Sequence, residues 1–283
     1  MGTVYLNGKY LPLEQAAIGP QDRGFQLGDG IFELVRAYSG HWFHLPEHLA
    51  RLGRAAHFLR LVRQDFSEMA GVADRLLAEN RMQGQNALFY LQITRGVAPR
   101  GLTFPGVDTP LTLYASVQKF QPDLHMREQG VRAVWVADGR GARCDHKTIE
   151  RLANVLAHQE ALDQGADQAI FVRNGLVSEG AHTNVFAQVG DTLITPAIGS
   201  GHLLPGITRQ VLLDLCRSHA IPVQETELSV GMLHSASEIM LSATTMEIVP
   251  VVSLNGRPVG TGTPGPVVRR LQHLFQDITP KPR

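Results

Sequence analysis

The sequence predicts an α+β protein with mainly antiparallel sheets that is divided into two domains. Short β-rich runs follow one another and are joined by Asn-Gly pairs, which favour tight type I′ hairpins between antiparallel strands. Amphipathic helices separate these groups of strands. The chain has 283 residues, and domains commonly have about 100–200 residues, so two domains fit its length.

The first half of the chain reads as strands, then helices, then strands again. Asn7-Gly8 indicates a hairpin, and Pro46 suits the first turn of a helix in which Leu49, Leu52 and Ala56 share one face. A loop rich in Gly and Pro precedes the last strand. We expect strands at 3–6, 9–11, 31–38, 41–44, 87–94 and 111–117, and helices from 46 and over 65–79. These elements define an N-terminal domain over residues 1–118.

A polar segment at 119–130 interrupts the pattern, and we interpret it as an interdomain linker. The remainder, 131–283, is expected to form the C-terminal domain. Asn174-Gly175 and Asn255-Gly256 indicate two more hairpins. We expect strands at 131–137, 183–189, 192–195, 223–226, 238–241 and 248–253, and helices over 148–163, over 206–219 and from 266. Ile149, Leu152 and Leu156 are expected on the buried face of the first of these helices.

The overall composition excludes several functional classes. Basic and acidic residues number 26 each, so the formal net charge is zero and nucleic acid is not an expected partner. No apolar stretch approaches the about 20 residues of a membrane span, and the N-terminus lacks the pattern of a signal peptide. Cys144 and Cys216 lie far apart in the sequence, which is typical of a reducing compartment. We therefore expect a cytoplasmic protein without a membrane partner.

Two familiar motif types are weak in this sequence. His44 and His48 have the i,i+4 spacing of metal ligands, but Pro46 lies between them at a helix start. We expect both histidines on the surface and no metal site. The run 260–265 matches a GxGxxG pattern, but too little chain follows it for a βαβ unit.

The lysines are few, and one of them is well placed for chemistry. Against 22 arginines the chain has four lysines, and Lys147 alone lies where an irregular loop leads into a helix. A partly desolvated lysine has a lowered pKa and can form a Schiff base. The alternative is an ordinary solvated lysine at the start of a helix.

Two segments could hold a phosphate group. Gly206, Ile207 and Thr208 begin a helix, whose free N–H groups attract anions. The run SATTMEI places small and hydroxyl residues, Ala243 and Thr244 among them, just after a strand. Each has a structural alternative, a capped helix and a polar turn. Glu179, at the end of a strand, is a candidate carboxylate. A lysine, a later carboxylate and two phosphate-binding segments together suit pyridoxal phosphate.

These residues belong to a set of motifs that resembles the fold-type IV pyridoxal-phosphate enzymes, the class IV aminotransferases. The likeness runs from DRGFQLGDGIFE through HLARL, ITRGVAPRG, RCDHK, SEGAHTNVF and LPGITR to SATTMEIVPV. It implies a smaller N-terminal α/β domain, a larger C-terminal domain and a homodimer whose subunits complete each other's substrate pockets. It also implies that Lys147 is the catalytic Schiff-base lysine and that Glu179 partners the pyridine nitrogen. The remaining cofactor-binding residues implied are Arg51, Leu204, Ile207, Thr208, Ala243 and Thr244.

Within this family the sequence is most similar to D-amino-acid transaminases, which exchange an amino group between a D-amino acid, such as D-alanine, and a 2-oxo acid. Their carboxylate grip of Tyr, Arg and His corresponds here to Phe32, Arg100 and Leu102, and Thr245 is a further substrate residue. Branched-chain enzymes usually have a Tyr where this chain has Leu152. Aminodeoxychorismate lyase, branched-chain aminotransferase and (R)-amine transaminase stay open as alternatives. A non-catalytic pyridoxal-phosphate-binding protein is a further one.

Overall fold

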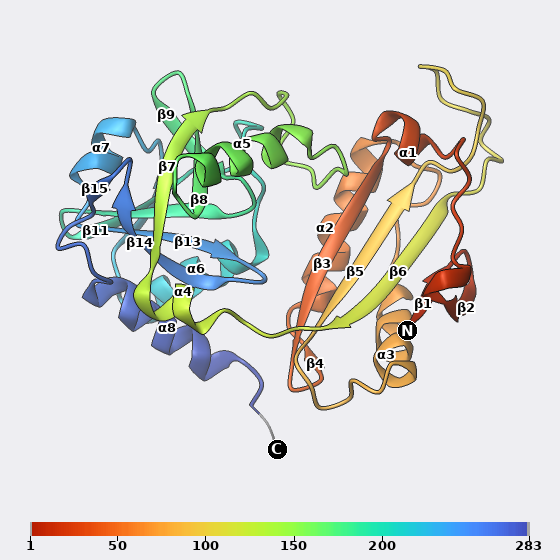
Figure 1. Ribbon diagram of the computed structural model, residues 1–283, viewed down its shortest axis with the longest axis horizontal. Coiled ribbons are helices and arrows are strands. Elements are labelled where there is room, and N and C mark those ends of the chain that lie inside the picture. Colours follow the sequence, from red (N-terminus) through yellow and green to blue (C-terminus); the bar gives the residue numbers. More distant parts are fainter. Residues whose placement is uncertain (1, 282–283) are drawn as a thin grey trace. The chain divides into compact units, whose positions relative to one another are not determined.

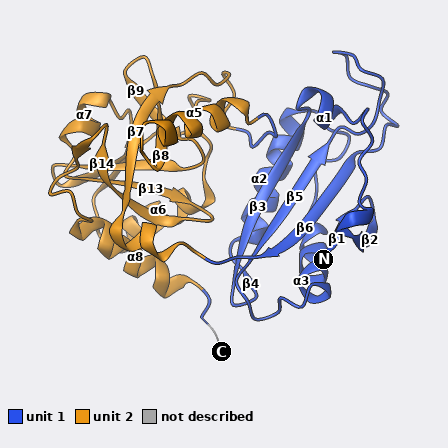
Figure 2. Ribbon diagram, viewed as in Figure 1, with its two compact units in different colours: residues 1–121, 146–150, 280–283 blue, residues 122–145, 151–279 orange. Residues whose placement is uncertain are grey.

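The computed structural model describes residues 2–281 and contains two compact units. Unit 1 comprises the described parts of 1–121, 146–150 and 280–283, and unit 2 comprises 122–145 and 151–279 (Figure 2). The short segment 146–150 thus leaves the second half of the chain and packs with the first. A single boundary in the sequence, as expected at 119–130, does not describe this exchange. The two-domain assignment therefore stays a prediction.

Unit 1 is built on a six-stranded sheet in the order β2-β1-β6-β5-β3-β4, with antiparallel pairing throughout. Helices α2 and α3 pack against this sheet (Figure 1). Its strands are β1 (Thr3–Leu6), β2 (Lys9–Pro12), β3 (Gly30–Tyr38), β4 (His41–Trp42), β5 (Ala87–Thr94) and β6 (Thr112–Lys119). Its helices are η1 (Leu13–Gln15), α1 (Arg23–Leu27), α2 (Leu45–Phe58) and α3 (Met69–Glu79).

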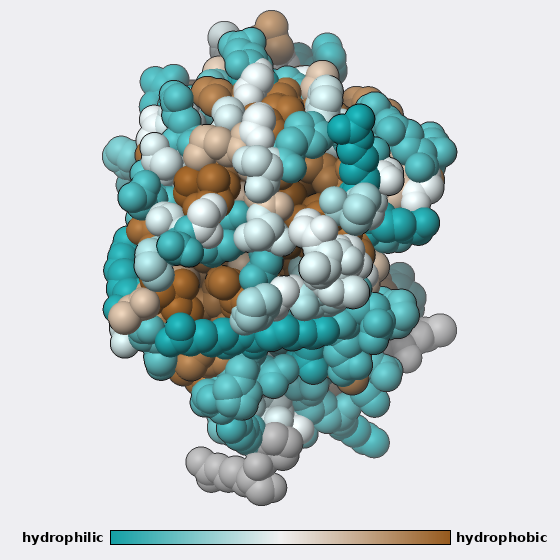
Figure 3. Space-filling view, turned by 90° about the vertical axis from the view of Figure 1, so that its left-hand side faces the viewer, coloured by the Kyte–Doolittle hydropathy of each residue, from teal (hydrophilic) through white to brown (hydrophobic). Residues whose placement is uncertain are grey.

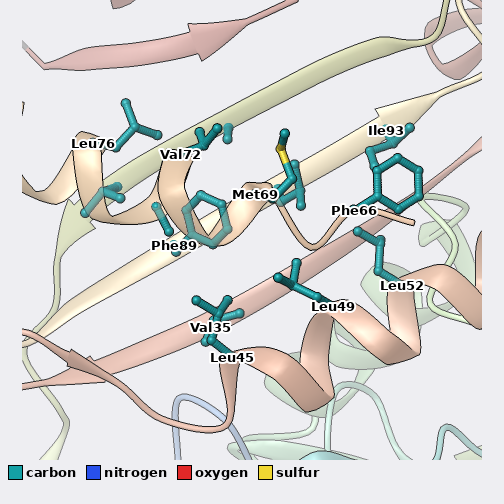
Figure 4. Packing of buried hydrophobic residues seen from close by; sticks show 14 of the residues in the cluster. Val35, Leu45, Leu49, Leu52, Phe66, Met69, Val72, Leu76, Phe89 and Ile93 are labelled. Carbon is teal, nitrogen blue, oxygen red and sulfur yellow. The ribbon is translucent and has the colours of Figure 1, made fainter. Parts of the chain in front are cut away.

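The core of unit 1 explains why these segments form these elements. Alternate residues of β3 and β5 point to one face, where they meet the apolar sides of α2 and α3 (Figure 4). Pro46 lies in the first turn of α2, as expected, and Asn7 and Gly8 both have positive φ in their hairpin. The side chains drawn in this core include Val35, Leu45, Leu49, Leu52, Phe66, Met69, Val72, Leu76, Phe89 and Ile93.

Unit 2 is built on a nine-stranded mixed sheet, ordered β12-β11-β10-β13-β14-β7-β8-β9, with β15 paired to β14. Most of its pairs are antiparallel, but β7 runs parallel to β8 and β14, and β11 runs parallel to β12. The strands are β7 (Val131–Ala137), β8 (Gln168–Arg173), β9 (Leu176–Gly180), β10 (Asn184–Val189), β11 (Thr192–Pro196), β12 (Val223–Thr226), β13 (Glu238–Ala243), β14 (Glu247–Leu254) and β15 (Arg257–Pro258). The helices are α4 (Leu124–Gln129), α5 (Leu152–Asp163), α6 (Ile207–Ser218), α7 (Val230–Ser235) and α8 (Pro266–Ile278).

The polar segment at 119–130, which we interpret as an interdomain linker, contains a helix that the sequence did not predict. This helix is α4, which Asp123 caps through the Met126 amide. The next predicted helix needs correction. Helix α5 begins at Leu152 rather than at Thr148. Its expected buried face is also wrong, since Leu152 and Leu156 are 69% and 60% exposed.

The face of the protein shown in Figure 3 carries both apolar and hydrophilic side chains. On the face shown in Figure 3, apolar side chains gather in separate patches with hydrophilic side chains between them. Within residues 2–281, no helix has the length and apolar character that crossing a membrane requires.

Candidate active site

Lys147 lies in a segment that extends the sheet of unit 1. The Phe32 amide donates to the Lys147 carbonyl (3.0 Å), and the Ile149 amide donates to the Gly30 carbonyl (3.1 Å). These two bonds hold residues 147–149 in an extended conformation beside β3, which is why α5 starts later than expected. The Lys147 Nζ lies 4.5 Å from the centre of the Phe32 ring. The backbone of Lys147 is therefore held against β3, and its amine lies over the Phe32 ring.

A buried ionic cluster lies between β3 and α2 of the same unit. Glu33, which is fully buried, accepts hydrogen bonds from Arg51 Nε (2.7 Å) and Nη2 (2.8 Å). The His48 Nδ1 lies 2.8 Å from Oε2 of Glu33, the oxygen that also accepts from Arg51 Nη2. Burial would raise the pKa of Glu33, but the charge of Arg51 and the hydrogen bonds from both partners hold it well below its usual range.

His48 is neutral in this cluster. Burial lowers the pKa of His48 most, and the attraction of Glu33 only partly opposes that effect. Because a carboxylate only accepts, Nδ1 must carry the proton that it donates to Glu33. His48 is thus not on the surface, as the sequence suggested, but is 2% exposed. Arg51, the expected phosphate ligand, has part of its guanidinium committed to Glu33.

The predicted substrate residues Arg100 and Leu102 lie on the loop between β5 and β6. Both are solvent-exposed in this unit, Leu102 by 92%. The loop is anchored next to them, because Arg23 Nη1 donates to the Gly101 carbonyl (2.8 Å) and the guanidinium of Arg95 lies 3.8 Å from the centre of the Phe104 ring. These two contacts hold in place the part of the loop that carries Arg100.

In unit 2 the backbone of Leu204 connects the predicted cofactor residues. Its amide donates to Oε2 of Glu179 (2.9 Å), and its carbonyl accepts from Asn184 Nδ2 (2.9 Å). Asn184 pairs in register with Ser242 of β13, so the strand that ends at Ala243 lies beside it. Sequence reasoning did not single out Asn184, although it stands within the SEGAHTNVF motif.

The two predicted phosphate segments both adjoin Asn184. Gly206 is the N-cap of α6. The amides of Ile207 and Thr208, which are the first two of the helix, therefore have no partner within it. Thr244 and Thr245 form the turn that follows Ala243 at the end of β13. The structure therefore brings together Glu179, Leu204, the start of α6 and the 243–245 turn within unit 2.

Two observations concern the surroundings of Asn184. A Cβ added at Gly206 would lie 2.0 Å from Asn184 Oδ1, so only glycine lets Asn184 pack this closely against the start of α6. The hydroxyl oxygens of Thr183 and Ser242 are buried and have no hydrogen-bond partner within the described residues. Buried polar atoms normally have partners, so these two favour a ligand nearby.

Glu179 has an ionic neighbour that the sequence did not reveal. Arg140 Nη1 donates to Oε1 of Glu179, while Nε and Nη2 of Arg140 bind Asp138 at 2.9 and 3.0 Å. Burial raises the pKa of Glu179, and the charge of Arg140 opposes this effect without cancelling it. A buried carboxylate with a guanidinium partner can bind a protonated ring nitrogen.

Comparison with known proteins decides the family. The family model described as amino-transferase class IV matches residues 30–254. The chain belongs to the class IV aminotransferases. D-alanine aminotransferase of Staphylococcus haemolyticus is 37% identical to it over 97% of both chains, and D-alanine aminotransferase of Bacillus licheniformis is 34% identical over 97% of this chain and 96% of its own.

A solved structure agrees with this assignment. The branched-chain amino acid aminotransferase of Escherichia coli superposes with a TM-score of 0.92 at 29% identity, covering 98% of this chain and 94% of its own. The predicted fold class, α+β with mainly antiparallel sheets and the type IV fold that the resemblance implies, is therefore confirmed for this class IV aminotransferase. The chain is an enzyme of a transferase family, and the roles of its individual residues follow as proposals.

Proposed function

We propose that this class IV aminotransferase uses pyridoxal phosphate to move an amino group between a D-amino acid, such as D-alanine, and a 2-oxo acid. The observation that carries the cofactor proposal is the linkage through Leu204. The backbone of Leu204 connects the buried Glu179 carboxylate to Asn184, which packs against Gly206 at the start of α6. The proposed ring-nitrogen partner and the proposed phosphate site therefore adjoin. Near-full-length similarity to D-alanine aminotransferases favours the choice of substrate.

Each protein group has a specific task in this proposal. When bound, pyridoxal phosphate supplies an aldehyde that attaches amines and a ring that accepts electrons. Lys147 Nζ would hold the cofactor covalently through its aldehyde carbon, and once a substrate amine has displaced it, the freed amine would take and return the proton of the substrate carbon. Glu179 accepts a hydrogen bond from the protonated ring nitrogen and keeps it charged, and Leu204 packs on the ring.

The phosphate is held by amides and side chains. We assign this role to the amides of Ile207 and Thr208, where the dipole of α6 adds attraction, and to the 243–244 segment with the Thr244 hydroxyl. Arg51 is the remaining phosphate ligand of the proposal. Because Glu33 already binds two of its nitrogens, Arg51 approaches the phosphate in a fixed orientation.

The substrate side of the proposal rests on Arg100. Arg100 binds the substrate carboxylate, while Phe32 and Leu102 make the rest of that pocket apolar and Thr245 contributes a hydroxyl. Phe32 and Leu102 lack the donors that a Tyr and a His would provide, so D-amino acids should bind weakly. The same feature favours the second candidate, an amine transaminase whose donor has no carboxylate.

We also propose that the enzyme is a cytoplasmic homodimer. Both Cys144 and Cys216 are free thiols, which agrees with a reducing compartment. The exposed apolar side chains of Leu102 and Val107, 92% and 80% exposed, support burial of their loop by a second copy. Light scattering on the purified protein tests the dimeric state directly.

The function is tested by supplying single amino donors with 2-oxoglutarate to the purified protein reconstituted with pyridoxal phosphate. The donors are D-alanine, L-leucine and (R)-1-phenylethylamine, and aminodeoxychorismate is tested for cleavage in parallel. We expect transamination of D-alanine to exceed that of L-leucine, and no activity in Lys147→Ala. A preference for L-leucine, or cleavage of aminodeoxychorismate alone, would contradict the proposal.

A further inference from the structure

We propose that Arg140 is a positioning residue that favours the ionised form of Glu179 and fixes the direction of its carboxylate. This inference rests on the proposed function only in taking the ring nitrogen as the target of Glu179. Its basis is the network around Arg140, which holds one guanidinium between two carboxylates.

Arg140 is fixed on all sides. Its Nη2 binds Asp138 Oδ2 (3.0 Å), Ser178 Oγ (3.1 Å) and the carbonyl of His202 (2.9 Å), while Nη1 binds Glu179. The plane of the guanidinium lies over the ring of Phe171, 4.2 Å from its centre. A side chain held in this way has no freedom to leave Glu179, so it determines where the carboxylate points.

Asp138 supports this arrangement from the far side. Burial would raise the pKa of Asp138, but its hydrogen bonds and charge interaction with Arg140, together with the charge of Arg173, lower it below the usual value. Asp138 is therefore ionised and orients the Arg140 fork through two nitrogens. Arg173 contacts Asp138 at 3.5 Å, and Arg151 adds a positive charge near Glu179.

Arg140 differs from Arg151 and Arg173 because it contacts the Glu179 side chain directly. Within the described residues, the Glu179 side chain accepts hydrogen bonds from Arg140 and from the Leu204 amide. Arg151 instead donates to the carbonyl of Ala181 (2.7 Å), and Arg173 to the carbonyl of Arg140 (2.6 Å). Loss of Arg140 would leave Glu179 buried without its direct cationic partner, and a buried carboxyl then takes up a proton.

A protonated Glu179 could not form an ion pair with the ring nitrogen. The cofactor would still bind through Lys147 and its phosphate, but the ring would lose its positive charge. The proposal therefore separates two effects: a large loss of kcat and a small change in KM and in cofactor affinity.

The decisive experiment titrates Glu179 in the cofactor-free protein by carbon-13 NMR with labelled glutamate, using Glu179→Gln to assign its signal. In Arg140→Gln we expect the Glu179 midpoint to rise by at least about one pH unit. Arg140→Lys keeps the positive charge but loses the planar guanidinium that donates to both carboxylates, so it should give a smaller rise in the Glu179 midpoint. After reconstitution, we expect Arg140→Gln to lose at least about tenfold in kcat, as we also expect of Glu179→Gln, with KM nearly unchanged.

Arg209→Gln is the matched control. Arg209 is as buried as Arg140 and binds Glu225 at 2.9 Å, but it does not contact Glu179. Arg209→Gln should lower the melting temperature without changing the titration midpoint of Glu179. An unchanged midpoint in Arg140→Lys and Arg140→Gln would show that Arg140 is only structural and would overturn the proposal. If Arg140→Gln does not fold, the Glu179 midpoints of Arg140→Lys and Asp138→Asn decide whether the proposal holds. A parent protein that binds no pyridoxal phosphate would refute the proposed function, while the titration would still decide the coupling.

Discussion

The amine of Lys147 lies 4.5 Å from the centre of the Phe32 ring, and the amide of Phe32 donates to the carbonyl of Lys147 at 3.0 Å. The residue that we propose faces the substrate is thus joined to the residue that we propose carries the cofactor. Any group added to the Phe32 ring is held close to the reacting amine. This contact makes Phe32 a sensitive position for substrate choice.

Phe32→Tyr should improve the use of D-amino acids. A hydroxyl near Lys147 adds a hydrogen-bond donor for the substrate carboxylate, and a bond to a charged group contributes about 1.5–3 kcal/mol. We expect KM for D-alanine to fall about tenfold, with little change for (R)-1-phenylethylamine, measured by steady-state kinetics. Phe25→Tyr, at a site 80% exposed, is the control. An equal change for both donors would argue against a carboxylate near Phe32.

Arg100→Ala should have the opposite selectivity. Arg100 is the remaining cation of the proposed carboxylate grip, and loss of such a charge pair costs about 2–5 kcal/mol when it is partly desolvated. The expected result is a drop of tenfold or more in kcat/KM for D-alanine and almost none for (R)-1-phenylethylamine. Arg54→Ala, an exposed arginine on α2, controls for lost surface charge. The role of Arg100 would be refuted by equal losses with both donors.

Gly206→Ala tests the phosphate site through its backbone. The new Cβ would approach Asn184 Oδ1 to 2.0 Å, so either the start of α6 or Asn184 must move. We predict at least about tenfold weaker binding of pyridoxal phosphate in an absorbance titration. Gly231→Ala is the matched control, because its Cβ would meet only Ser229 Oγ at 3.7 Å. Unchanged affinity in Gly206→Ala would place the phosphate elsewhere.

His48 should make stability depend on pH. Its pKa is lowered in the folded protein, so the unfolded chain binds more protons below its ordinary pKa of about 6.5. Stability is therefore complete above this pH and falls as the pH drops toward the folded pKa, by up to about 1.4 kcal/mol per pH unit. Urea unfolding between pH 7.5 and 5.5 should show this slope in the parent and a smaller one in His48→Asn. Parallel slopes would contradict a neutral His48.

The sequence predicted the local elements well and the long-range ones poorly. Hairpins at Asn7-Gly8 and Asn174-Gly175 depend on residues that adopt positive φ, and both formed. The expected helix start at Thr148 failed because residues 147–149 pair with β3, more than a hundred positions earlier. Local propensity carries no information about such a partner.

The site shows the same division. Lys147, Glu179 and the start of α6 stood out because their chemistry is visible in the residue type and its local context. Arg140 and Glu33 did not, because a charged residue in a sequence gives no sign that folding will bury it beside an opposite charge. His48 was misjudged for this reason, since its burial depends on packing against β3.

Lys147 is the residue that we propose carries the cofactor of this class IV aminotransferase. Borohydride reduction of the reconstituted enzyme, followed by proteolysis and mass spectrometry of the modified peptide, tests this role. We predict one phosphopyridoxyl adduct, on Lys147, and its loss when D-alanine is added before reduction without a 2-oxo acid. An adduct on Lys9, Lys119 or Lys281 instead would contradict it.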